Sequence, residues 1–349
     1  MTDLPESDRV PPPPAPASAA PVLPEPSAAV SAPGPFRLLF IPLVLVATMV
    51  LIWAVLRWPT RPTVSPRDLV RDLAQPGRSH WQQAYSLAEL LRDPDRAELR
   101  QDAALAADLA AALQVQLDAV QTDANRINLR IFLCRALGEF AIPAGLPVLI
   151  QAARQERSPA DVAVRRAALE ALAARASHAD PPSLQSDDAV LEVLIAAARD
   201  RGPATSDPAP RDALRACAAF GLGVVGSQAA LAELRPLLDD PIPNVRYNAA
   251  AGLARHGHST AIPVLLEMLA LDSPEAVSEE ASAAGRAWKQ ALVWTNALRA
   301  TRQLAQRNPA ADCRSLMAAS ELLTRADLPA EVRSQARETL ATLRKTSPP

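Results

Sequence analysis

Apolar residues in most of the chain follow the period of an α-helix. From residue 66 onward they recur at i, i+3, i+4 and i+7, the spacing that places side chains on one helix face. The strictly alternating runs typical of half-buried strands do not occur in this region. Aromatic residues make up only 3% of the chain, so Ala and Leu must fill its core. These features predict an all-α protein and disfavour β-sandwiches and barrels.

An uninterrupted apolar segment precedes the helical region. Residues 38–56 carry no charge and are bounded by Arg37 and Arg57. As a helix this segment would measure about 28 Å, close to the hydrocarbon thickness of a bilayer. We predict a single transmembrane helix at 36–58 and a linker at 59–65. A cleaved signal peptide is disfavoured because the run is long and the residues before it are not basic; a buried soluble helix is the other alternative.

The residues on either side of this span differ in composition. The first 35 residues hold eleven of the 34 prolines and few bulky apolar groups, which predicts a disordered Pro/Ala-rich tail at 1–35. Arg37 alone closely precedes the span, whereas four arginines follow it: Arg57, Arg61, Arg67 and Arg71. The positive-inside rule therefore favours a single-pass membrane protein whose C-terminal region is cytoplasmic. An exported C-terminal domain with a cytoplasmic tail is the alternative.

The helical region contains an internal repeat. Segments 214–222 and 245–253 align on Arg215 and Arg246, and both have Gly at +6 and +11 and Leu at +7. The same frame fits five further positions: Gln83, Arg130, Arg165, Ala291 and Arg333. Repeated helical units that cannot bury their apolar faces alone stack into a solenoid. We predict an α-solenoid of about seven helical hairpins over residues 66–349.

The best-defined repeat lies at residues 239–272. It carries Val245-Arg246, Ala249-Ala250 and Leu253, followed by Ala261-Ile262-Pro263. This pattern resembles HEAT repeats of the short bacterial type named after phycobilisome lyases, and a looser resemblance extends over about 66–345. The resemblance implies a HEAT-like scaffold that binds another protein. It also leaves open an accessory or lyase-like factor that handles a chromophore or cofactor of a partner enzyme.

The repeated arginines have two interpretations. In the first, each pairs with an Asp at an adjacent turn between helices, such as Asp239 or Asp240. In the second, they form a ladder that binds phosphate groups. The acidic residues balance the basic ones and leave a net charge of −2, which favours the ion pairs. That charge also gives no basis for nucleic-acid binding through a general basic field.

Residues that could carry catalysis are sparse. None of the four His residues is followed by Glu, so the His-Glu pairs of deoxyhypusine hydroxylase, an enzyme of HEAT-like sequence, are missing. The three Cys residues show no C-x-x-C spacing. The glycines of 221–226 follow a helical pattern rather than a strand, unlike a dinucleotide-binding loop. We therefore expect no enzyme activity, cofactor, metal or small-molecule substrate, and we expect Trp288 and Trp294 to fill pockets.

The repeat frame also predicts where a partner protein binds. If +3, +4 and +7 face the core, then +2, +5 and +9 lie on the opposite side of the helix. In a curved solenoid that side lines the concave surface, and mixed apolar and charged groups there suit an amphipathic peptide or helix. The candidate partner-binding residues are Phe132, Arg135, Glu139, Glu170, Phe220, Asn248, Arg255 and Asn296. The alternative is that Phe132 and Phe220 pack between neighbouring repeats.

Overall fold

The computed structural model describes residues 46–53, 66, 70, 80–119, 123–178, 187–203, 207–278, 280–325 and 327–346. The chain divides into two compact units, Met1–Thr63 and Val64–Pro349. In the first unit the described residues, 46–53, are helical. The predicted tail at 1–35, the linker at 59–65 and the rest of the span at 36–58 lie outside the described residues. Within the part of the chain that is described, no helix is both long and apolar enough to span a bilayer.

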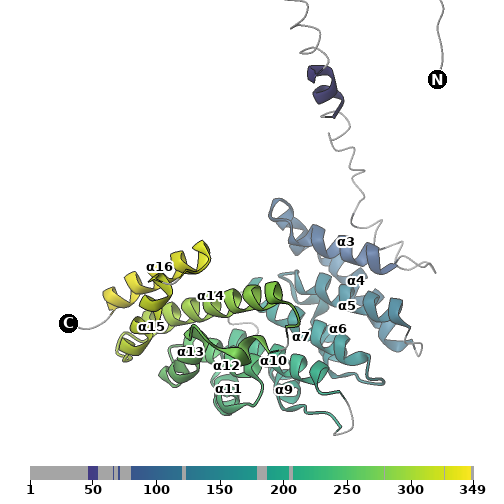
Figure 1. Cartoon of the computed structure of the whole chain (residues 1–349). Coiled ribbons are helices and arrows are strands. Elements are labelled where there is room, and N and C mark those ends of the chain that lie inside the picture. Colours follow the sequence, from purple (N-terminus) through teal and green to yellow (C-terminus); the bar gives the residue numbers. More distant parts are fainter. Residues whose placement is uncertain are drawn as a thin grey trace, which may run out of the picture. The chain divides into compact units, whose positions relative to one another are not determined.

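The second unit is built from two layers of helices, and its described residues contain no strand. The seven positions that align in the sequence fall on seven helices, one in each repeat, which form the inner layer (Figure 1). These helices are α3 (His80–Arg92), α5 (Ala124–Gly138), α7 (Asp161–His178), α10 (Ala209–Val225), α12 (Pro243–Arg255), α14 (Ala283–Arg307) and α16 (Ala330–Thr346). Each inner-layer helix packs against the next one.

The outer layer connects these helices. It consists of α4 (Ala103–Asp118), α6 (Leu146–Arg154), α9 (Asp188–Arg199), α11 (Gln228–Leu234), α13 (Ile262–Leu269) and α15 (Arg314–Arg325). Short 3₁₀ turns join the layers at Pro94–Gln101, Pro143–Gly145, Pro236–Asp239, Ser259–Ala261 and Pro274–Val277. Within residues 80–346 the described helices make six hairpins, with α16 as a last single helix. The all-α solenoid is confirmed, and the predicted count of about seven hairpins is close to the six found there.

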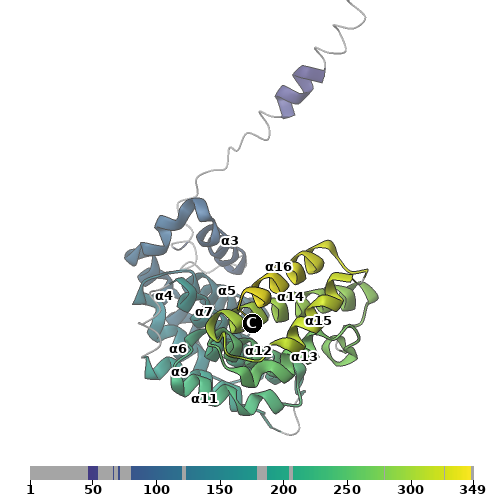
Figure 2. The same cartoon turned by 90° about the vertical axis from the view of Figure 1, so that its left-hand side faces the viewer.

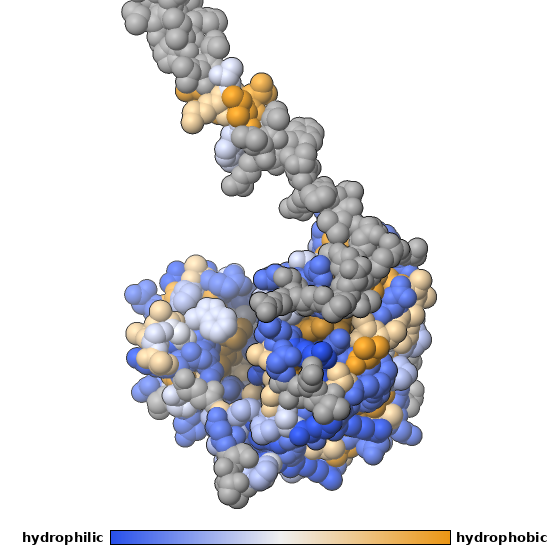
Figure 3. All heavy atoms as spheres, turned by 90° about the vertical axis from the view of Figure 1, so that its right-hand side faces the viewer, coloured by the Kyte–Doolittle hydropathy of each residue, from blue (hydrophilic) through white to orange (hydrophobic). Residues whose placement is uncertain are grey.

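Outer-layer neighbours contact each other less than inner-layer neighbours do, so the stack bends toward the inner layer (Figure 2). The inner layer therefore lines the concave side, as the repeat frame predicts. Figure 3 shows a largely hydrophilic surface that is hollowed on one side.

The predicted core positions are buried. Ala249, Ala250 and Leu253, at +3, +4 and +7 of the repeat, have no exposed surface. Cys134 is also fully buried, so the small apolar residues of one repeat continue into the next as one core. Because alanine is short, the inner helices can approach closely and lose most of their apolar surface to each other.

Glycine permits the closest of these approaches. A Cβ atom at Gly223 of α10 would lie 2.6 Å from the Cα atom of Gly252 in α12, so the two backbones are in contact. The glycines at +11 act differently. Gly226 and Gly257 have φ of 63° and 82°, the left-handed conformation that ends a helix, which explains why Gly recurs there.

The predicted arginine–aspartate pairs connect successive repeats. Arg130 lies 3.2 Å from Asp161, Arg165 lies 2.7 Å from Asp200, and the side chains of Arg215 and Asp240 form a buried ion pair. Asp161 is the first residue of α7, Asp240 lies three residues before α12, and Asp200 directly follows α9 in the connection to α10. Because the three arginines are buried, they cannot serve as a ladder for phosphate groups.

The remaining two arginines of the frame differ from the prediction. Arg246 lies 2.6 Å from Glu267 and 3.1 Å from Glu275, so it pairs with glutamates instead of an aspartate. Arg333 donates a hydrogen bond of 2.8 Å to the carbonyl of Leu328. The reason is positional: α16 is the last described helix, so no described aspartate of a following repeat faces Arg333.

Candidate functional site

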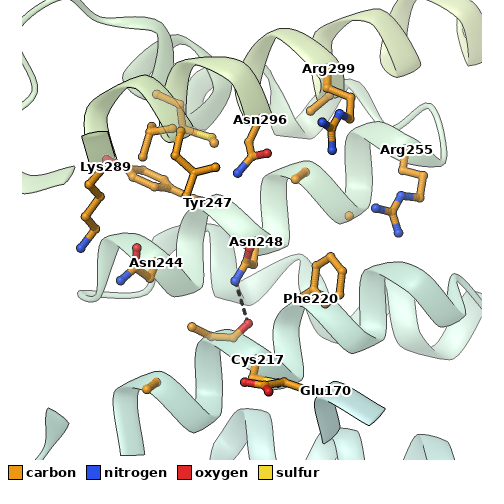
Figure 4. A pocket seen from close by; sticks show the side chains of 18 of the residues that line it. Glu170, Cys217, Phe220, Asn244, Tyr247, Asn248, Arg255, Lys289, Asn296 and Arg299 are labelled. Carbon is orange, nitrogen blue, oxygen red and sulfur yellow. Dashed lines mark hydrogen bonds between the residues drawn. The ribbon is translucent and has the colours of Figure 1, made fainter. Parts of the chain in front are cut away.

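A hollow of about 440 Å³ lies on the concave side of the inner layer, across α7, α10, α12 and α14. We call it the concave hollow. It gathers five of the eight predicted partner-binding residues, and Figure 4 shows their side chains directed toward the shared space: Glu170, Phe220, Asn248, Arg255 and Asn296. They come from four successive repeats, with Asn248 and Arg255 both on α12, and the common helical phase of the repeats brings them together.

Helix α14 supplies one wall of the concave hollow through a single row of side chains. Leu292, Asn296, Arg299 and Gln303 follow each other at steps of four, three and four residues, which keeps them on one helix face. Our sequence analysis named only Asn296 from this row. The frame at Ala291 is a weak copy, and the row occupies +1, +5, +8 and +12 of that frame instead of the expected +2, +5 and +9. Arg166 and Lys289 also line the concave hollow and were also missed.

Two arginines form what we call the cationic end of the concave hollow. Arg255 comes from the end of α12 and Arg299 from α14, on the same side of the space (Figure 4). Burial lowers the pKa of Arg255, and the positive charge of Arg299 lowers it further. Among the described residues neither guanidinium forms an ion pair; Arg255 makes only a long hydrogen bond of 3.5 Å to the Gly223 carbonyl.

An aromatic ring lies next to the cationic end. The guanidinium carbon of Arg255 is 5.9 Å from the ring centroid of Phe220, within the range of a cation–π contact. Phe220 is 42% exposed although it is a large apolar residue. The alternative that Phe220 is tucked between repeats therefore does not describe this structure.

Amide side chains occupy the middle of the concave hollow. The Asn248 side-chain nitrogen donates a hydrogen bond of 2.8 Å to the Ala216 carbonyl, which fixes the orientation of that side chain (Figure 4). Asn296 lies opposite on α14 and is partly exposed. Because a primary amide both donates and accepts hydrogen bonds, these two groups can bind a peptide backbone.

On the α7 side of the concave hollow, two cations share one acid. Glu170 lies 3.6 Å from a nitrogen of Arg135 and 3.4 Å from a nitrogen of Arg166. These pairs are partly exposed, so each contributes little to stability. They nevertheless hold the acid between two cations, and Arg135 of α5 extends the polar surface beyond the concave hollow.

The other two predicted residues, Phe132 on α5 and Glu139 directly after it, have contacts within the protein. The ring of Phe132 stacks on Trp81 at 5.9 Å and meets Tyr85 edge-on at 5.3 Å, so for this residue packing between repeats applies. Glu139 is only 7% exposed and accepts a hydrogen bond of 2.8 Å from Arg92 of α3. Neither side chain lines the concave hollow.

Cys217 and the two tryptophans differ in how far they are exposed and in what they contact. Burial raises the pKa of Cys217, which lines the concave hollow, to about 12, so this thiol is a poor nucleophile at neutral pH. Trp294 is buried and donates a hydrogen bond of 2.9 Å to the Ala270 carbonyl, as expected for a core residue. The same expectation for Trp288 is wrong, because this side chain is 68% exposed. Within the described residues, no cluster of three or more His, Cys, Asp or Glu side chains could hold a metal ion.

Comparison with known families identifies one matching segment. Residues 202–285 match the family model of HEAT repeats, and this segment contains α10 to α13. The match supports the resemblance that the sequence shows at 239–272. No relative is found among curated proteins.

Several solved structures are similar to this chain at low identity. The complex of CpcE and CpcF of phycocyanin lyase from Nostoc sp. PCC7120 is 18% identical, with 82% of this chain and 97% of that chain covered and a TM-score of 0.48. Human deoxyhypusine hydroxylase in complex with glycerol is 19% identical, with 82% and 99% covered and a TM-score of 0.31. An engineered protein is 14% identical, with 81% and 97% covered and a TM-score of 0.35. At these values none of them indicates what this chain binds.

Proposed function

We propose that this protein is a membrane-tethered HEAT-repeat scaffold that binds a segment of another protein in its concave hollow. The observation that carries the proposal is the row of exposed apolar, amide and charged side chains that four successive inner-layer helices present to one space. Such a mixture suits an amphipathic peptide or helix better than an apolar small molecule.

The spacing of the helices supports an elongated ligand. Packed helices lie about 8–10 Å apart, so the four helices from α7 to α14 extend over roughly 25–30 Å. An extended peptide covers about 3.3 Å per residue, so about eight or nine residues would reach from one end to the other. A small molecule would contact only part of this row.

Two substitutions test the proposal. Phe220→Asp and Arg135→Glu should abolish capture of a partner that co-purifies with the unaltered chain from native membranes. Because both side chains are partly exposed, the melting temperature should change little. Leu222→Asp is the contrasting variant, since Leu222 is fully buried two residues from Phe220 and an unpaired charge there should unfold the repeat.

Two outcomes would count against the scaffold. The first is retention of the partner by Phe220→Asp; the second is a collapse of its melting temperature similar to that of Leu222→Asp. Stoichiometric pigment or metal in the purified chain would instead favour an accessory subunit that handles a chromophore or cofactor.

The membrane tether is a separate part of the proposal, and it rests on the uncharged sequence 38–56 between two arginines. The full chain should remain in the membrane pellet after washing with alkaline carbonate, and deletion of 36–58 should release it. A reporter fused to the C-terminus should read cytoplasmic, since four arginines follow the span. Release of the intact chain by the wash would overturn the tether. A periplasmic reporter signal would overturn its orientation.

A further inference from the structure

Resting on the proposed function, we infer that the segment bound in the concave hollow is acidic. One carboxylate of the bound segment docks at the cationic end, between Arg255 and Arg299, and an apolar side chain beside it packs on Phe220. The occupant is therefore a peptide segment in which Asp or Glu stands next to an apolar residue.

The first argument is the contrast between Arg255 and the other arginines of the inner layer. Arg130, Arg165 and Arg215 are each matched by a carboxylate of the following repeat. Arg255 is also partly withdrawn from water, but burial and Arg299 both disfavour its charged form. A bound carboxylate would favour that form and could accept hydrogen bonds from both guanidinium groups.

The second argument is the exposed apolar surface of the concave hollow, which lies next to Arg255 at Phe220 and two helical turns from Arg299 at Leu292. Phe220 of α10 is 42% exposed and Leu292 of α14 is 44% exposed. Exposed apolar side chains gain free energy when a ligand covers them, so the ligand must offer apolar atoms as well as negative charge. A nucleic acid offers a run of phosphates, and the two arginines of the cationic end give it little to bind.

The third argument concerns the backbone of the ligand. Asn248 and Asn296 lie in the middle of the concave hollow beside the cationic end, and their amides can donate to a peptide carbonyl and accept from a peptide N–H. Glu170 is shared by Arg166 and Arg135, and Lys289 lies 3.9 Å from Glu280, so among the described cations that line the concave hollow only Arg255 and Arg299 have no carboxylate partner. This polarity sets where the acidic residue of the peptide lies.

The test selects peptides from a random display library on the full-length chain in detergent micelles. The selected sequences should be enriched in Asp or Glu adjacent to Leu, Ile, Val or Phe. A fluorescent copy of the best peptide should bind the Arg255→Gln/Arg299→Gln variant about tenfold or more weakly, and added salt should weaken its binding to the unaltered chain. The matched control is Arg235→Gln, because Arg235 is an exposed arginine that follows α11 in the outer layer; this variant should bind normally.

The outcomes separate this inference from the proposed function. Selected peptides without acidic residues, or equal affinity for the double variant, would overturn the acidic occupant, while loss of binding in Phe220→Asp would still support the concave hollow as the binding site. If Phe220→Asp also binds normally, or if no sequence is enriched, both the inference and the proposed function fail. Short single-stranded RNA and unlabelled peptide are also compared as competitors of the fluorescent peptide. If the RNA displaces it at a lower concentration than the unlabelled peptide does, the two arginines recognise phosphate instead.

Discussion

Removal of the buried carboxylate of Asp240 should destabilise the centre of the solenoid. Asp240 is 4% exposed and pairs with Arg215, which is 1% exposed. The side chain of Asp240 also accepts a hydrogen bond of 3.0 Å from the backbone N–H of Ile242, ahead of α12. The substitution Asp240→Asn keeps an oxygen that can accept this hydrogen bond but removes the negative charge. The effect of the variant therefore reports mainly on the ion pair.

The size of the effect follows from what remains around Arg215. Its other partners are Asp212 at 3.2 Å, which is partly exposed, and the Ala198 carbonyl at 3.4 Å. Removing one partner of a buried ion pair lowers the free energy of unfolding by about 3–5 kcal/mol, because the charge of the remaining partner stays buried without compensation. Since Asp212 offsets part of this cost, we expect a loss of about 3 kcal/mol. For the unit Val64–Pro349, with an unfolding entropy of about 2.1 cal/mol/K per residue, that corresponds to a melting temperature roughly 5 °C lower.

The assay is thermal unfolding followed by circular dichroism at neutral pH. Asp239→Asn is the matched control, because Asp239 is the exposed neighbour and should change the free energy of unfolding by less than about 0.5 kcal/mol. The double variant Arg215→Met/Asp240→Asn should recover part of the loss, since it removes both buried charges. Equal melting temperatures for Asp240→Asn and Asp239→Asn would refute the role of the ion pair in joining the repeats.

Three further predictions concern the stability of the solenoid. Gly223→Ala should lower the free energy of unfolding by about 1–3 kcal/mol, because α10 and α12 must separate to make room for the added methyl group. The control Gly285→Ala meets only flexible side chains and should be tolerated. Equal melting temperatures for the two variants would contradict this prediction. Burial lowers the pKa of His256 below its unfolded value of about 6.5. The stability that neutral His256 contributes is therefore full above about pH 6.5 and is lost as the pH falls toward the folded-state pKa. In thermal melts, His256→Gln should flatten this pH dependence, and the control His258→Gln should not. Residues 59–349 should fold alone as a helical domain, and substantial sheet in circular dichroism would show otherwise.

The candidate site shows where sequence reasoning succeeds and where it stops. The helical phase placed Asn248, Arg255 and Asn296 on the concave side, because the direction of a side chain depends on local helix geometry. It missed Arg299, because the repeat at α14 carries no arginine that fixes the frame and its row of side chains is shifted within it. A search for rows at steps of three and four residues along 288–303 would have found Arg299.

The sequence by itself determined the local properties of this protein: helices from the apolar period, helix ends from the glycines at +11, and the stacking of repeats from the recurring Arg, Ala and Leu. Only the tertiary structure decided what each exposed position contacts. Phe132 and Phe220 occupy similar helical phases, yet Trp81 and Tyr85 cover the first, whereas the second stays exposed beside Arg255. The physical reason is that helix phase depends on neighbours in the sequence, whereas burial and charge pairing depend on which side chains the adjacent repeats bring near.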